Sequence, residues 1–93
     1  MKFRFEVIVS LKPGLLDPQG KAVEGSLPAM GWTNVSDVRI GKHIDLVVDA
    51  RSESEATGLV SEIAERLLSN PVIEDYRVAL AAPLQGLALE DVP

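Results

Sequence analysis

Two prolines and two glycines fall within residues 11–20 (LKPGLLDPQG), and this stretch constrains the fold more than any other part of the chain. Pro13 fixes its own φ and Gly14 permits a positive φ, so a turn is expected there. Asp17-Pro18 is typical of a helix start. The Asp17 carboxylate can accept hydrogen bonds from the unpaired N–H groups of the first helical turn, and Pro18 lacks only an N–H that would have no partner within the helix. The stretch predicts a rigid connection from a strand to a helix. An ordinary turn is the plainer interpretation, and a site or subunit contact is the alternative.

Strands are predicted on both sides of this connection. Apolar and polar residues alternate from Phe3 to Leu11, which indicates a strand with one buried face. The segments 35–40 and 44–48 are predicted to form a hairpin around Gly41-Lys42-His43. A three-residue loop is preferred to a two-residue loop, because it places apolar residues opposite one another. A last strand is expected over residues 72–80.

Two helices are predicted. The first begins at Pro18 and extends to about Met30, with Pro28 kinking or shortening its last turn. The second follows the capping-box pattern of Ser52 and Glu55 and ends before Pro71. Its apolar stripe has clear helical spacing and consists of Ala56, Leu59, Val60, Ile63, Ala64 and Leu67.

The predicted order of elements is β-α-β-β-α-β. This order indicates an α+β two-layer sandwich, with an antiparallel sheet and two helices on one face. Residues 1–80 are expected to form a single domain and residues 81–93 a C-terminal tail. Because a chain of 93 residues has a small core, oligomerisation is also expected.

Composition excludes several classes of protein. The formal net charge is −5, and the exposed strand face lacks aromatics, which argues against nucleic-acid binding. No apolar stretch of about 18 residues is present, so no membrane-spanning segment is expected. The charged N-terminal residues do not suit a signal peptide, and the chain has no cysteine. We therefore expect a cytoplasmic protein.

No catalytic or metal-binding pattern is evident in the sequence. His43 is the single histidine, so a metal site or a nucleophile–histidine–carboxylate triad is disfavoured. Gly20-Lys21-Ala22 departs from a phosphate-binding loop in both spacing and its last residue. Glu74 and Asp75 are adjacent in a predicted strand and therefore point to opposite faces. The sequence predicts no catalytic residues and no metal ligands.

The remaining polar residues cluster at the ends of elements, where they suit contacts with another protein. The predicted partner-interface residues are Lys12, Asp17, Gln19, Arg39, Lys42, Asn70 and Tyr76.

Four segments together resemble a known family. Residues 11–20, 38–42 (VRIGK) and 64–76 (AERLLSNPVIEDY) are similar to the small S subunit of phosphoribosylformylglycinamidine synthase, the PurS family, and Ala22-Val23 fits between them. The match runs from about Phe3 to Val78. Ser69 departs from it, since a small residue such as alanine is expected there.

The resemblance implies a non-catalytic subunit of a glutamine- and ATP-dependent ligase in purine biosynthesis. Such a subunit forms a dimer or tetramer, bridges a glutaminase and a synthetase, and assists ammonia transfer between them. It binds no cofactor itself, whereas the complex uses ATP and magnesium. A different class stays open: a small α+β regulatory module that binds an amino acid or a nucleotide at a dimer interface.

Overall fold

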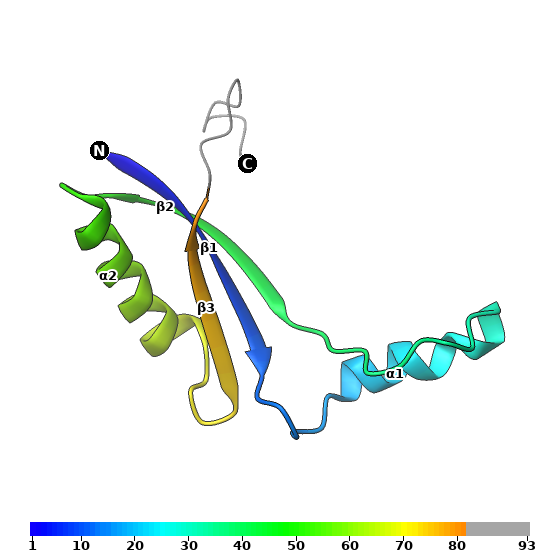
Figure 1. Ribbon diagram of the computed structural model, residues 1–93. Coiled ribbons are helices and arrows are strands. Elements are labelled where there is room, and N and C mark those ends of the chain that lie inside the picture. The colour runs from blue at the N-terminus through cyan, green and yellow to red at the C-terminus, as the bar shows by residue number, and fades with distance from the viewer. Residues whose placement is uncertain (82–93) are drawn as a thin grey trace.

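The computed structural model describes residues 1–81 (Figure 1). Its elements, in chain order, are β1 (Lys2–Leu11), α1 (Pro18–Ser26), the short 3₁₀ helix η1 (Pro28–Met30), β2 (Lys42–Asp49), α2 (Glu53–Ile63), the π-helical turn η2 (Ala64–Leu68) and β3 (Glu74–Leu80). The expected α+β class and antiparallel sheet are confirmed. No helix of residues 1–81 has both the length and the apolar character needed to span a bilayer.

Within residues 1–81 the sheet has three antiparallel strands in the order β2-β1-β3. The alternation predicted for β1 places Phe5, Val7 and Val9 in the core, each at most 1% exposed. Helix α2 covers that face with Ala56 and Val60, both fully buried. One face of the sheet is therefore packed against α2, whereas the opposite face carries the polar residues of each strand.

Helix α2 begins as predicted, but the side chains that are buried at its C-terminal end differ from the predicted apolar stripe. Ser52 is the N-cap, and its Oγ accepts a hydrogen bond from the Glu55 N–H at 3.1 Å. The chain then passes into the π-helical turn η2, which adds a residue to one turn and so changes which side chains face the sheet. Leu68 consequently packs against the core. Leu67, predicted to be buried, is 77% exposed.

The predicted strand over residues 35–40 is wrong, because this segment forms no strand and the expected hairpin is absent from residues 1–81. Two carboxylates, one in α1 and one at its N-cap, accept hydrogen bonds from backbone N–H groups of this segment that a strand would use for pairing. The Val38 N–H donates to Glu24 Oε1 at 3.1 Å, and the Ile40 N–H donates to Asp17 Oδ2 at 2.7 Å. The segment therefore runs back beside α1 (Figure 1).

The first helix also differs from the expected one in length and position. It ends at Ser26, and Pro28 starts a separate 3₁₀ turn that Gly31 closes at φ +99°. It projects away from the sheet instead of covering it, and its main contact is with η1 (Figure 1). The radius of gyration is 16.9 Å, against about 12 Å for a compact domain of this length. Of the two helices predicted on one face, only α2 covers the sheet in the described part of the chain.

Residues 12–41, named the arm below, thus form a projection from a compact unit of sheet and α2. The expected tail begins at residue 81, and residues 82–93 lie outside the described part of the chain.

Candidate functional site: the junction of the arm and the sheet

The arm joins the sheet at a cluster of loops and element ends that we call the junction, made of residues 11–20, 38–42 and 70–75. Asp17 lies at its centre and is 4% exposed. Its Oδ1 accepts a hydrogen bond from the Gly20 N–H at 2.8 Å, and its Oδ2 accepts the Ile40 N–H at 2.7 Å. The Asp17 carboxylate therefore caps α1 and also links the start of this helix to Ile40, where the chain returns toward the sheet.

These hydrogen bonds favour the ionised form of Asp17. The Gly20 N–H, the Ile40 N–H and then the nearby Arg39 guanidinium lower the pKa of the carboxyl below its usual value of 3.8, although desolvation opposes them. Asp17 is consequently an anion at neutral pH.

The junction also depends on two close backbone approaches. A Cβ at Gly20 would lie 2.2 Å from the Val38 carbonyl oxygen, and a Cβ at Gly41 would lie 2.6 Å from the Val9 carbonyl oxygen. Neither contact is possible for a larger residue without movement of the backbone. The glycines therefore set how closely the returning segment packs on α1 and on β1.

Three cations of the junction contact other segments of the chain. Arg39 Nη1 donates to the Leu15 carbonyl at 2.9 Å, and Lys42 Nζ donates to the Leu68 carbonyl at 3.0 Å. Lys12 Nζ lies 3.9 Å from Asp75 Oδ1, and the two side chains are 42% and 60% exposed. The Lys12 side chain is therefore held only loosely, in contrast to Arg39 and Lys42.

The third part of the junction is the turn at Asn70. Asn70 Oδ1 accepts the Val72 N–H at 3.1 Å, and the Asn70 N–H donates to Glu74 Oε1 at 2.7 Å. The Lys12 N–H donates to the Ile73 carbonyl at 2.9 Å, which fixes this turn beside the start of the arm.

A hollow of about 440 Å³ lies at the junction, and Gln19 and Lys42 are among its lining residues.

The structure brings together six of the seven residues predicted from sequence. Lys12, Gln19, Arg39, Lys42 and Asn70 lie on the accessible part of the junction, whereas Asp17 is buried and committed to backbone contacts. The seventh, Tyr76, lies on β3 and packs against the core. A hydrogen bond with Glu65 raises the pKa of the Tyr76 hydroxyl, with desolvation adding to the effect. Whether these residues contact a partner stays a prediction.

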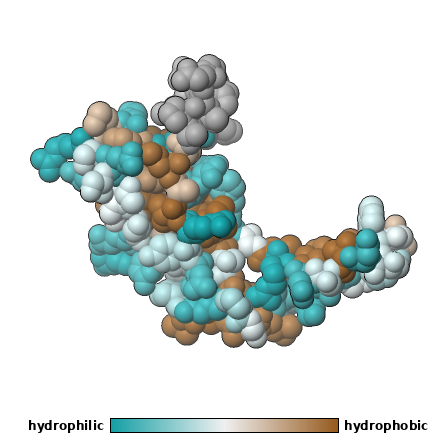
Figure 2. All heavy atoms as spheres, in the orientation of Figure 1, coloured by the Kyte–Doolittle hydropathy of each residue, from teal (hydrophilic) through white to brown (hydrophobic). Residues whose placement is uncertain are grey.

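Sequence reasoning did not identify the exposed apolar surface of the arm. Leu16 is 71% exposed, Met30 64% and Trp32 51%, and Val23 is also exposed. Figure 2 shows apolar atoms along the projecting segment. The helical spacing of Val23 and Met30 predicted that both are buried, but in the single chain both are exposed, because α1 projects away from the sheet.

The arrangement of strands, arm and junction has counterparts in known proteins. The family model named PurS and described as phosphoribosylformylglycinamidine (FGAM) synthase matches residues 4–82. The chain belongs to this family. A relative from Bacillus subtilis, phosphoribosylformylglycinamidine synthase subunit PurS, is 48% identical over 75 residues, which cover 81% of this chain and 88% of the relative. The predicted resemblance is therefore confirmed.

Solved structures agree with this assignment. The crystal structure of the purS subunit of phosphoribosylformylglycinamidine synthase from Thermotoga maritima is similar at a TM-score of 0.81 and 33% identity, covering 87% of this chain and 93% of that one. A chain in the structure of PurLQS from the same organism also gives a TM-score of 0.81 at 33% identity, covering 87% and 99%. Family members with this fold therefore include one determined within a larger assembly.

Proposed function

We propose that the chain is a non-catalytic subunit of phosphoribosylformylglycinamidine synthase in purine biosynthesis. The observation that supports this most directly is the family match over residues 4–82, since it includes the arm and the junction as well as the sheet. By analogy with the PurLQS relative, its partners are a glutaminase subunit and a synthetase subunit. The subunit bridges them and assists ammonia transfer. It binds no cofactor of its own, and the complex uses ATP and magnesium.

Reconstitution tests this proposal. The purified chain is added to the glutaminase and synthetase subunits of its own organism, and ATP turnover is measured with glutamine and, separately, with ammonium as nitrogen source. We expect the chain to raise glutamine-dependent turnover and to leave ammonium-supported turnover unchanged, because only the former needs ammonia to pass between subunits. If the chain neither binds the two subunits nor raises glutamine-dependent turnover, the proposal is wrong.

The arm supports self-association as part of this function. Its apolar side chains are exposed in the single chain, and burial of apolar surface is the main driving force of stable subunit contacts. We propose that the arm buries Leu16, Met30 and Trp32 against a second copy, giving a dimer or a tetramer. In the same contact, the arm of the second copy would cover the part of the sheet that α1 of the same chain leaves uncovered.

Sedimentation of single substitutions tests this contact. Leu16→Asp is expected to shift the chain toward monomer, because an unpaired carboxylate would be desolvated in the interface. Leu67→Asp is the matched control, since Leu67 is similarly exposed but lies outside the arm. Equal association of the Leu16→Asp variant and the unaltered chain would contradict the role of the arm.

The accessible junction residues are proposed to contact the glutaminase or the synthetase. Lys12, Gln19, Arg39, Lys42 and Asn70 all lie in the segments of the junction, whose backbone is held in place by hydrogen bonds. A backbone that is already fixed loses little conformational entropy on binding, which favours a protein contact at this position. Asp17 contributes by fixing the loops, and its own side chain is buried.

The alternative function is a regulatory module that binds a small molecule. The hollow lined by Gln19 and Lys42 is the observation that favours it. Calorimetry of the isolated chain with glycine, glutamine, ATP and ADP separates the two proposals, because tight binding without partner subunits supports the regulatory module. With either function we propose a cytoplasmic location, consistent with the lack of cysteine.

A further inference from the structure

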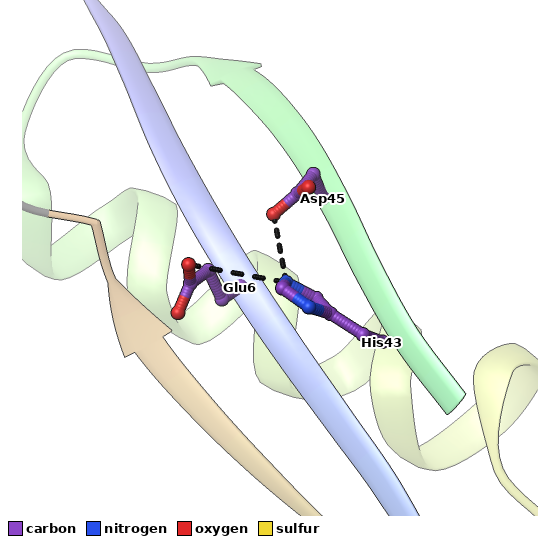
Figure 3. Close-up of side chains that lie close together, drawn as sticks. All are labelled: Glu6, His43 and Asp45. Carbon is purple, nitrogen blue, oxygen red and sulfur yellow. Dashed lines mark hydrogen bonds and ion pairs between the residues drawn. The ribbon is translucent and has the colours of Figure 1, made fainter. Parts of the chain in front are cut away.

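Three potential metal ligands meet on the sheet face that α2 does not cover. Figure 3 shows Glu6 on β1 and His43 and Asp45 on β2 pointing toward one another. His43 Nε2 lies 3.0 Å from Asp45 Oδ1 and 3.8 Å from Glu6 Oε1. The three ligand atoms all lie within 4.8 Å of one another.

The strand register explains this arrangement. Glu6 pairs directly with Asp45, and Ile8 pairs with His43, so His43 is the diagonal neighbour of Glu6 on the same face. His43 and Asp45 are two residues apart in β2 and therefore point to one side of the sheet. Because the three side chains rise from two paired strands, their backbone positions are fixed by the ladder, as a preorganised site requires.

The separations suit a small divalent cation. With bonds of about 2.0 to 2.1 Å, neighbouring ligands in octahedral or tetrahedral coordination lie about 2.8 to 3.4 Å apart. The 3.0 Å distance from His43 Nε2 to Asp45 Oδ1 falls within this range, and the 3.8 Å distance to Glu6 Oε1 lies beyond it. Small side-chain rotations would therefore bring all three atoms into one coordination shell.

The charge of the cluster is also favourable. Its two carboxylates carry a charge of −2 when ionised, and within residues 1–81 neither forms an ion pair with Arg4 or Arg77 of the same face. All three side chains are about half exposed, at 45% to 52%, so an ion has a path to them.

We propose that Glu6, His43 and Asp45 bind a divalent transition-metal ion of the Zn²⁺ type. An imidazole nitrogen among the ligands favours such ions over Mg²⁺ and Ca²⁺, which prefer oxygen ligands throughout. Three protein ligands leave at least one position for water or for a group from another molecule. The sequence alone argued against this site because His43 has no second histidine or cysteine, and the pairing of β1 with β2 supplies the missing ligand.

The single histidine allows a direct test with the full chain free of any affinity tag. Zn²⁺ is titrated while the imidazole resonances are followed by NMR, and calorimetry gives the stoichiometry. We expect one ion per chain with a change at His43 Nε2. His43→Asn should abolish this binding, and Glu6→Gln and Asp45→Asn should each weaken it by at least about tenfold. Asp75→Asn is the matched control and should bind as the unaltered chain does, because Asp75 lies on the same face but on β3.

Two results would overturn the proposal. One is the absence of saturable binding at millimolar Zn²⁺, and the other is unchanged affinity in the His43→Asn variant, which would place the ion elsewhere on this acidic chain. Thermal unfolding confirms that each variant is folded. Were His43→Asn unfolded, the Glu6→Gln and Asp45→Asn affinities would decide, and equal affinity in both variants and the unaltered chain would overturn the site.

Discussion

The sheet with α2 and the arm are stabilised in opposite ways. In the sheet Phe5 and Val7, and in α2 Val60, are fully buried within one chain. In the arm, Leu16 and Trp32 are exposed, and the carboxylates of Asp17 and Glu24 hold the returning segment by hydrogen bonds to its backbone. The sheet and α2 therefore form an apolar core within one chain, whereas the arm is held mainly by polar contacts and leaves its apolar side chains exposed.

Truncation of an aromatic side chain in each region gives the largest expected contrast. Phe5→Ala should lower the free energy of unfolding by about 3 to 5 kcal/mol, because it leaves a cavity in the core. Trp32→Ala should change it by about 0.5 kcal/mol or less at a protein concentration where the chain is monomeric. Urea denaturation measures both, and similar losses in the two variants would contradict the division into two regions.

Gly20→Ala tests the close approach that shapes the arm. The new Cβ would lie 2.2 Å from the Val38 carbonyl oxygen, so the returning segment must move. We expect a loss of about 1 to 3 kcal/mol, with faster amide exchange in residues 18–40 and unchanged exchange in α2. Gly25→Ala is the control, since a Cβ there meets no atom within 4 Å.

Asp17 should make the arm sensitive to acid. Its folded pKa lies below the usual 3.8, so its contribution is fully present above that value and is lost as the pH falls through the folded pKa. Asp17→Asn should remove this part of the pH dependence and should loosen the arm at neutral pH, because an amide NH₂ group cannot accept a second backbone N–H.

Amide exchange of the Ile40 N–H between pH 5 and pH 2 measures this effect. Protection that falls at low pH in the unaltered chain and is already low in Asp17→Asn is the expected pattern. Equal protection in the two proteins at pH 5 would show that the arm does not depend on the carboxylate.

The smallest effect on stability is expected at Lys12. Its contact with Asp75 is long and exposed, so Lys12→Ala should cost about 0.5 kcal/mol or less. Association with the partner subunits should nevertheless weaken, because the proposed contact needs the cation. Lys21→Ala, which removes an exposed cation of α1 outside the junction, is the control. A large fall in the thermal midpoint of Lys12→Ala would make Lys12 a structural residue instead.

Local patterns allowed most elements to be predicted from the sequence. The alternation in β1, the Ser52 cap of α2 and the Asp17-Pro18 start of α1 are all present in the structure. Each depends on neighbouring residues in the chain, where spacing alone determines which groups meet. The junction residues were identified for the same reason, since they lie at the ends of predicted elements.

The sequence was not sufficient where a group has more than one possible partner in the folded chain. The segment 35–40 has the alternation of a strand, but the carboxylates of Asp17 and Glu24 take two of its backbone donors. The π-helical turn after α2 changes which side chains face the sheet, so Leu67 is exposed. Glu6 reached His43 only through the pairing of β1 with β2.

The α+β class, the family and the connection at residues 11–20 could thus be predicted from the sequence, because these depend on local spacing and residue type. Only the folded chain shows that α1 leaves the sheet, that the sheet has three strands within residues 1–81 and that the arm exposes its apolar side chains. Those outcomes depend on which distant group satisfies each backbone donor, and a linear pattern does not encode that competition.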